Sequence, residues 1–160
     1  MRKGKISAST IAFLVLLVPL LLILRTRLGG VAPTPAAFTQ VRTLDDALAQ
    51  SEQTGKPVLA FATADWCGAC QAFKRGALAD EKVTQWINAN TIPVYIDMTH
   101  NSDPQAQQAS RLLGVRAVPL LVLLDSNTIY GRLEGGTRSA KLMSWFEKVK
   151  TASLASTSKP

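Results

Sequence analysis

Short apolar segments alternate along the chain with segments that repeat apolar residues at helical spacing. Apolar runs bounded by turn residues are typical of buried strands, and stripes at three- and four-residue spacing are typical of amphipathic helices. The first pattern predicts strands at Phe38–Val41, Val58–Ala64, Ile92–Ile96, Leu120–Leu124 and Thr128–Leu133. The second predicts helices between Thr43 and Gly55, over Ala69–Ala79, from Asp80 to Ile87, from Asp103 to Leu113 and over Ser139–Lys150.

The order of these elements indicates the fold class. Helices separate the first four strands, and this alternation favours parallel strands joined by right-handed crossovers. The turn residues Asp125-Ser126-Asn127 separate the last two strands, so we expect these two to form an antiparallel hairpin. The sequence therefore predicts an α/β fold, with a mixed central sheet flanked by helices and a core suited to a domain of about 120 residues.

The N-terminal segment is apolar over a longer stretch. No residue from Ile6 to Leu24 is charged, and nineteen residues at the helical rise span roughly the hydrocarbon core of a bilayer. A cationic start followed by an apolar run also describes a signal peptide. Cleavage of a signal peptide needs small residues soon after the apolar run, but Arg25-Thr26-Arg27 stands there. We therefore expect residues 1–27 to be an uncleaved single-pass anchor rather than a cleaved signal peptide.

The charge of the chain is concentrated near this segment. The 160 residues carry a formal net charge of +7, and five of the cations lie in the first 40 residues, which contain no Asp or Glu. No basic patch interleaved with aromatic residues follows, which argues against nucleic-acid binding. Positive residues are slightly more numerous before the apolar run than after it, which orients the N-terminus inside. Residues 28–160 are then expected on the outer, oxidising side of the membrane.

The composition also predicts the remaining boundaries. Residues 28–37 are rich in Gly, Pro and Ala, which is typical of a partly extended linker. The globular domain is predicted over residues 38–150. The small and polar residues 151–160 predict a disordered tail.

Cys67 and Cys70 are the only cysteines, and they follow a predicted buried strand where a helix begins. Backbone N–H groups and the macrodipole at a helix N-terminus favour a thiolate. A disulfide between them would close a four-residue loop and constrain the unfolded chain very little, so the pair is better explained by chemistry than by stability. We therefore expect thiol–disulfide exchange in which Cys67 attacks and Cys70 resolves.

A metal site is the main alternative for a pair of cysteines. Zinc sites use four protein ligands in structural centres, and His100 is the single histidine of the chain. We expect no metal and no other cofactor. Among the neighbouring charged residues, Asp65 is expected to point outward, and Lys74 and Arg75 are expected on a solvated helix face.

Four segments together carry a resemblance to a known family. They are Phe38-Thr39-Gln40-Val41, Gly55-Lys56-Pro57-Val58, Ala64-Asp65-Trp66-Cys67-Gly68-Ala69-Cys70 and Gly114-Val115-Arg116-Ala117-Val118-Pro119. Over residues 38–150 the chain resembles the thioredoxin superfamily, and within it the C-terminal periplasmic domain of DsbD-type thiol:disulfide interchange proteins. A tryptophan before CxxC, with Val-Pro some fifty residues later, is a far more specific signal than CxxC alone.

The resemblance implies roles for several residues around the cysteines. It implies that the peptide bond between Val118 and Pro119 is cis and that Pro119 faces the cysteine pair. It also implies that Trp66 shields the sulfur atoms and offers an apolar contact surface, and that Gly135 flanks the site. Gly68 and Ala69, between the cysteines, include neither the histidine of strong oxidants nor the proline of thioredoxins.

The chain departs from the family pattern at three positions. Phe61 stands six residues before Cys67, where many relatives carry a buried aspartate that is thought to take the proton of the second cysteine. Gln71 and Leu120 stand where lysine and threonine are common. The deprotonation of Cys70 therefore needs another explanation.

The resemblance implies a membrane-tethered thiol:disulfide oxidoreductase of the bacterial inner membrane whose domain faces the periplasm. The missing histidine between the cysteines favours reduction of disulfides in exported proteins. The expected partners are protein disulfide substrates and a separate thiol electron donor, and the protein is expected to be a monomer. A disulfide oxidase or isomerase, or a thioredoxin-like adaptor without redox work, remains the alternative.

Overall fold

The computed structural model of the chain describes residue 13 and residues 15–21, 30–40, 42–100 and 102–157. The chain divides into two compact units, residues 1–31 and 32–160. The described residues 15–21 of the first unit are helical. None of the helices among the described residues is both long and apolar enough to cross a membrane. The predicted span from Ile6 to Leu24 falls for the most part outside these residues.

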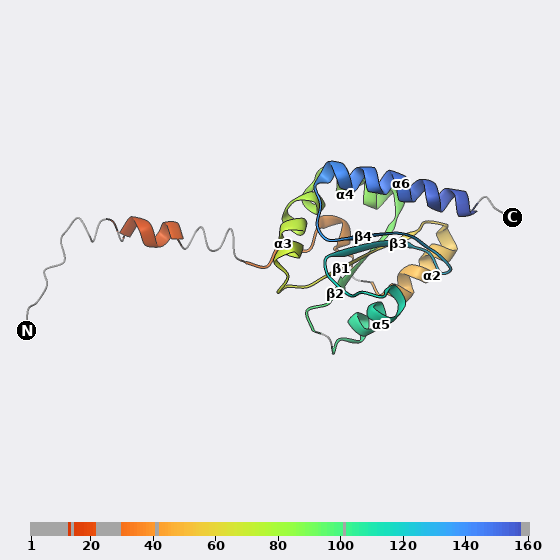
Figure 1. Cartoon of the computed structure of the whole chain (residues 1–160), viewed down its shortest axis with the longest axis horizontal. Helices are drawn as coiled ribbons and strands as arrows, with labels where there is room; N and C mark the ends of the chain where they lie inside the picture. The colour runs from red at the N-terminus through yellow and green to blue at the C-terminus, as the bar shows by residue number, and fades with distance from the viewer. Residues whose placement is uncertain (1–12, 14, 22–29, 41, 101, 158–160) are drawn as a thin grey trace, which may run out of the picture. The chain divides into compact units, whose positions relative to one another are not determined.

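The second unit is built on a four-stranded mixed sheet (Figure 1). In chain order the strands are β1 (Val58–Thr63), β2 (Ile92–Asp97), β3 (Leu120–Leu124) and β4 (Ile129–Glu134). Their order across the sheet is β2-β1-β3-β4, with β1 and β2 parallel and the other two pairs antiparallel. The predicted hairpin of β3 and β4 and the parallel pairing of β1 with β2 are confirmed. The expectation that Leu120–Leu124 is also parallel is wrong, because β3 pairs with β1 in the antiparallel sense.

Helices cover both faces of the sheet. They are α2 (Leu44–Thr54), α3 (Gly68–Arg75), α4 (Glu81–Asn90), α5 (Pro104–Leu113) and α6 (Ser139–Thr157), with short 3-10 turns η1 (Ala36–Phe38) and η2 (Ala77–Ala79). Alternate residues of β1 point into two core clusters, one shared with α2 and α5 and the other with α3, α4 and α6. In Figure 1, α4 and α6 accordingly lie on one side of the strands and α2 and α5 on the other.

The predicted first strand is wrong. Ala36–Phe38 forms a 3-10 turn, and the described residues Thr39 and Gln40 are not in a strand. The N–H of Phe38 donates to the carbonyl of Pro35 at 2.8 Å, and the Phe38 ring is buried with its centroid 5.4 Å from that of Phe61. Burial of this ring turns the chain inward, so the described residues of this segment pack near β2 without pairing with it as a strand. Val41 lies outside the described residues.

Two predicted helix boundaries are also corrected. The helix predicted over Ala69–Ala79 ends at Arg75, because Gly76 adopts a non-helical conformation and the chain continues as the separate turn η2. The last helix does not stop at Lys150 but reaches Thr157, so residues 151–157 are not a disordered tail. Ser153 is buried one turn beyond buried Val149, which extends the packed face of α6.

Packing also extends beyond the predicted start of the domain. Ala32 and Ala37, within the predicted linker 28–37, are 3% and 4% exposed. The N–H of Ala32 donates to the side chain of Gln71 on α3 at 2.6 Å. The end of the predicted linker is therefore attached to the helix that carries the cysteines.

Candidate active site

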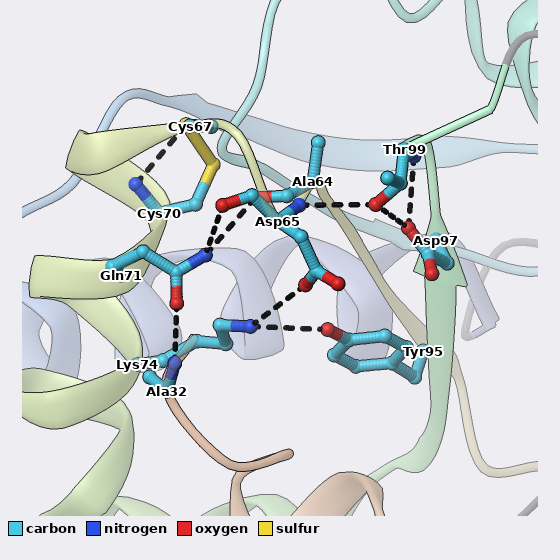
Figure 2. A network of polar contacts seen from close by, with 10 residues as sticks. All are labelled: Ala32, Ala64, Asp65, Cys67, Cys70, Gln71, Lys74, Tyr95, Asp97 and Thr99. Atoms are coloured by element: carbon cyan, nitrogen blue, oxygen red, sulfur yellow. Dashed lines mark hydrogen bonds and ion pairs between the residues drawn. A yellow bond between two sulfur atoms is a disulfide. The ribbon is translucent and has the colours of Figure 1, made fainter. Parts of the chain in front are cut away.

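The two cysteines lie where β1 gives way to α3. Cys67 is the N-cap residue of α3, with extended backbone dihedrals, and its Sγ accepts a hydrogen bond from the N–H of Cys70 at 3.1 Å. The two residues form a disulfide with their Cα atoms 5.2 Å apart (Figure 2). The predicted placement of the pair at a strand-to-helix turn is confirmed, and the helix N-terminus favours negative charge on Cys67.

The two sulfur-bearing residues differ in their access to solvent. Cys67 is 7% exposed, whereas Cys70 is completely buried in the core cluster shared with α2 and α5. Both residues are thus mostly buried, and the small solvent access that the pair keeps belongs to Cys67. This difference matches the chemistry expected of an attacking and a resolving cysteine.

The segment that faces the cysteines contains the predicted cis peptide bond, between Val118 and Pro119. The carbonyl oxygen of Val118 lies 3.5 Å from Cys67 Sγ. Gly135, which has a positive φ of 79°, donates its N–H to the carbonyl of Pro119 at 2.8 Å. The structure thus brings Val118 to the disulfide and joins Gly135 to Pro119, the residue that follows Val118, although both segments are distant from the cysteines in the sequence.

Trp66 lies on the solvent side of the site. Its side chain is 68% exposed, and its indole N–H donates to the carbonyl of Thr99 at 3.3 Å. Asp65, its neighbour, donates its backbone N–H to Thr99 Oγ1 at 3.0 Å. The loop after β2 therefore holds the residues that precede Cys67, while Gly68 and Ala69 leave the start of α3 open to solvent.

Phe61 is fully buried in a cluster of aromatic rings. Its ring centroid lies 5.9 Å from those of Phe73 and Tyr95. The position that holds a carboxylate in many relatives is thus part of an apolar core.

The prediction of a solvated Lys74 is wrong. Lys74 is 3% exposed, and its ammonium lies 3.3 Å from the hydroxyl of Tyr95 and 3.8 Å from the carboxylate of Asp65. The Asp65 side chain is 43% exposed, as expected for an outward residue, but it also faces this ammonium (Figure 2). A signal for burial was present in the sequence, because position 74 follows Cys70 by four residues and therefore lies on the same side of the helix.

Burial raises the pKa of Tyr95 to about 12, and the negative charges of Asp97 and Asp65 add to this effect. The phenol is therefore neutral at physiological pH. It meets the buried ammonium of Lys74 as an uncharged hydrogen-bond partner.

Gln71 is a structural residue that the sequence did not reveal. It is 8% exposed, and its amide nitrogen donates to the carbonyls of Ala64 and Asp65, both at 3.1 Å. Its amide oxygen accepts the hydrogen bond of Ala32. Gln71 thereby ties α3, the loop before Cys67 and the start of the folded unit together, as Figure 2 shows.

Comparisons with known proteins agree with this geometry. A family model described as thioredoxin-like matches residues 37–126. The thiol:disulfide interchange protein DsbD of Klebsiella pneumoniae is 31% identical over 119 residues, which cover 68% of this chain and 19% of the relative. The DsbD of Yersinia enterocolitica is 38% identical over 95 residues, covering 56% of this chain and 15% of the relative. The chain therefore spans less than a fifth of the length of these relatives.

Solved structures share the fold. A thioredoxin from Thermus thermophilus superposes with a TM-score of 0.61 at 22% identity, covering 69% of this chain and 85% of that one. The reduced C-terminal domain of Neisseria meningitidis DsbD superposes with a TM-score of 0.56 at 24% identity, covering 66% of this chain and 92% of that one.

Proposed function

The chain belongs to the thioredoxin-like family of thiol-disulfide oxidoreductases. We propose that it reduces disulfides of exported proteins through the Cys67–Cys70 dithiol. The observation that carries the proposal is the unequal exposure of the two cysteines. Cys67 lies at the helix N-terminus within reach of a partner, and Cys70 is buried directly behind it.

The proposed reaction proceeds in two exchange steps. The Cys67 thiolate attacks one sulfur of a substrate disulfide, and the other substrate sulfur leaves as a thiolate. Cys70 then loses its proton, and its thiolate attacks Cys67 Sγ. The mixed disulfide breaks, the second substrate sulfur leaves, and the Cys67–Cys70 disulfide forms. Substrate gains two electrons and the dithiol loses two, so a thiol donor must reduce the enzyme again.

One feature supports reduction as the direction, and a second supports thiol–disulfide exchange itself. Gly68 and Ala69 supply no histidine to stabilise a thiolate on Cys67, so one source of strong oxidising power is missing. The relatives with curated names are thiol:disulfide interchange proteins of the DsbD type. The match covers only a part of those proteins, so substrate and donor are proposed by chemical class alone.

The surroundings of the disulfide support binding of a protein substrate. Trp66 exposes a large apolar ring next to Cys67, and the carbonyl of Val118 borders the sulfur on another side. An extended substrate segment can contact both the ring and this backbone while its disulfide meets Cys67.

We place the enzyme at the bacterial inner membrane, with residues 1–27 as its anchor and the domain in the periplasm. The uncharged run from Ile6 to Leu24 and the cationic residues on either side support this placement. Alkaline carbonate washing of membranes tests it, because an anchored protein of full length stays in the membrane. A shortened protein in the wash would indicate a cleaved signal peptide.

Reduction of insulin disulfides by the full chain, followed by turbidity, tests the activity. Cys67→Ser and Cys70→Ser are matched variants, since each replaces one sulfur by oxygen. Both should abolish catalysis, but Cys70→Ser alone should accumulate mixed disulfides through Cys67. Unchanged function of the double variant in cells would show that the protein acts as an adaptor without redox work.

A further inference from the structure

A buried cation lies one helical turn beyond the resolving cysteine. Lys74 is 3% exposed, and Cys70 is completely buried on the same helix, α3. Residues four apart on a helix are neighbours, with roughly 5–6 Å between their Cβ atoms. Figure 2 shows both side chains on the inner side of α3.

Burial of an ammonium is unfavourable unless its charge and its hydrogen bonds are compensated. The described partners of Lys74 are the neutral hydroxyl of Tyr95 at 3.3 Å and the carboxylate of Asp65 at 3.8 Å. The carboxylate is 43% exposed, so water screens its charge, whereas the ammonium is screened little. The Lys74–Asp65 pair therefore presents a net positive electrostatic potential to the protein interior.

The other ionisable groups around the network do not reverse this sign. Asp97, at the end of β2, is exposed and bonds with the N–H and hydroxyl of Thr99. Arg75 follows Lys74 on α3 and is exposed. Phe61, six residues before Cys67, is fully buried and uncharged.

We propose that Lys74 acts on the resolving step by stabilising the thiolate of Cys70, and that Asp65 moderates this effect by pairing with the ammonium. The inference rests on the proposed dithiol exchange and deepens it by naming a residue that assists the resolving step. Lys74 is a positioning residue in this role: it touches neither substrate nor the reacting sulfur atoms. Its charge lowers the free energy of the thiolate relative to the thiol, while the proton of Cys70 leaves to solvent.

The two partners must then act in opposite directions. Lys74→Met removes the cation and keeps the volume, so the pKa of Cys70 should rise by about one unit. Asp65→Asn leaves the cation unopposed, so the same pKa should fall by roughly half a unit. A purely structural role for the pair predicts no such opposition, because loss of either partner would then disturb the site in the same sense.

The experiment follows each step separately with an aromatic disulfide that releases a coloured thiolate. The reduced full-length enzyme releases one thiolate when Cys67 attacks and a second when Cys70 resolves the mixed disulfide. The rate of the second release, measured across pH, reports the deprotonation of Cys70. Arg75→Met is the matched control, because it removes an exposed cation from the adjacent position of the same helix.

For Lys74→Met we expect the second release to slow by about tenfold at neutral pH and to recover at higher pH. Asp65→Asn should shift the midpoint of the pH dependence of the second release to lower pH. Arg75→Met should leave this midpoint unchanged. Shifts in the same direction for both partners, or shifts no larger than that of Arg75→Met, would overturn the inference. A wild-type enzyme that never releases the second thiolate would instead refute the proposed function.

Discussion

Replacement of Gln71 by alanine should weaken the folded state more than any exposed glutamine change on the same fold. The side chain makes three hydrogen bonds, to the carbonyls of Ala64 and Asp65 and from the N–H of Ala32. It is 8% exposed, so water does not readily replace what it loses.

The structure sets the size of the effect. A hydrogen bond contributes about 1 kcal/mol net, and a buried group left without a partner costs about 1–3 kcal/mol. Since the carbonyl of Asp65 is near solvent and the loop can relax, we expect Gln71→Ala to lower the free energy of unfolding by about 2–4 kcal/mol. Gln71→Glu keeps an acceptor for Ala32 but places a carboxylate against two carbonyls, so it should not rescue the loss.

Urea unfolding of the oxidised protein measures this change as a lower midpoint at a constant m-value. Gln85→Ala is the matched control, because Gln85 is exposed on α4 and its side-chain amide donates to the exposed Glu81. Gln85→Ala should lower the free energy of unfolding by no more than about 0.5 kcal/mol. A Gln71→Ala loss as small as that of the control would refute the role of Gln71 as a tie between three segments.

Two further predictions concern other parts of the fold. The hydrogen bonds of Asp80 with Ser139 and the N-terminus of α4 hold the pKa of its carboxyl group below the ordinary value of an aspartate. The stability it contributes is therefore present above the unfolded pKa and is lost as pH falls through the folded one. Asp80→Asn, which keeps the cap, should reduce the stability lost between neutral pH and about pH 3 in urea titrations; an unchanged acid loss would contradict this. A Cβ on Gly131 would collide with the side chain of Val149, whereas one on Gly68 meets nothing within 4 Å. Gly131→Ala should therefore cost about 1–3 kcal/mol in thermal or urea unfolding, and an effect equal to that of Gly68→Ala would show that α6 moves freely away.

The parts of the fold that follow from local rules could be predicted from the sequence. The helix predicted between Thr43 and Gly55 is observed as α2, which begins at a capping box of Thr43 and Asp46 and ends at Gly55 in the left-handed conformation. Asp103 caps α5 with Pro104 at its first position. These signals lie within a few residues of one another, so no tertiary context is needed to read them.

The errors arose where tertiary contacts outweigh the local pattern. Phe38 alternates with polar residues like a strand residue, but its ring is buried against Phe61 and the chain turns. Residues 151–157 are small and polar, yet they continue α6 because Ser153 packs on the domain. Their composition alone favoured disorder.

The candidate site divides in the same way. The placement of Cys67 and Cys70 at a helix start followed from the residues, and the cis bond before Pro119 followed from the family resemblance. The burial of Lys74 and the three bonds of Gln71 depend on Tyr95, Asp65 and Ala32, which are distant along the chain or lie across a turn. A long charged or polar side chain does not reveal by itself whether it reaches solvent or a buried partner.

The reduction potential of the Cys67–Cys70 pair tests the central claim most directly. It can be measured on the full chain by equilibration with glutathione or dithiothreitol buffers, with the reduced fraction read after alkylation. A protein-disulfide reductase should have a potential near that of thioredoxin, about −270 mV, and in any case below about −200 mV. A potential near about −120 mV, typical of a strong oxidant, would contradict the proposed direction of electron flow.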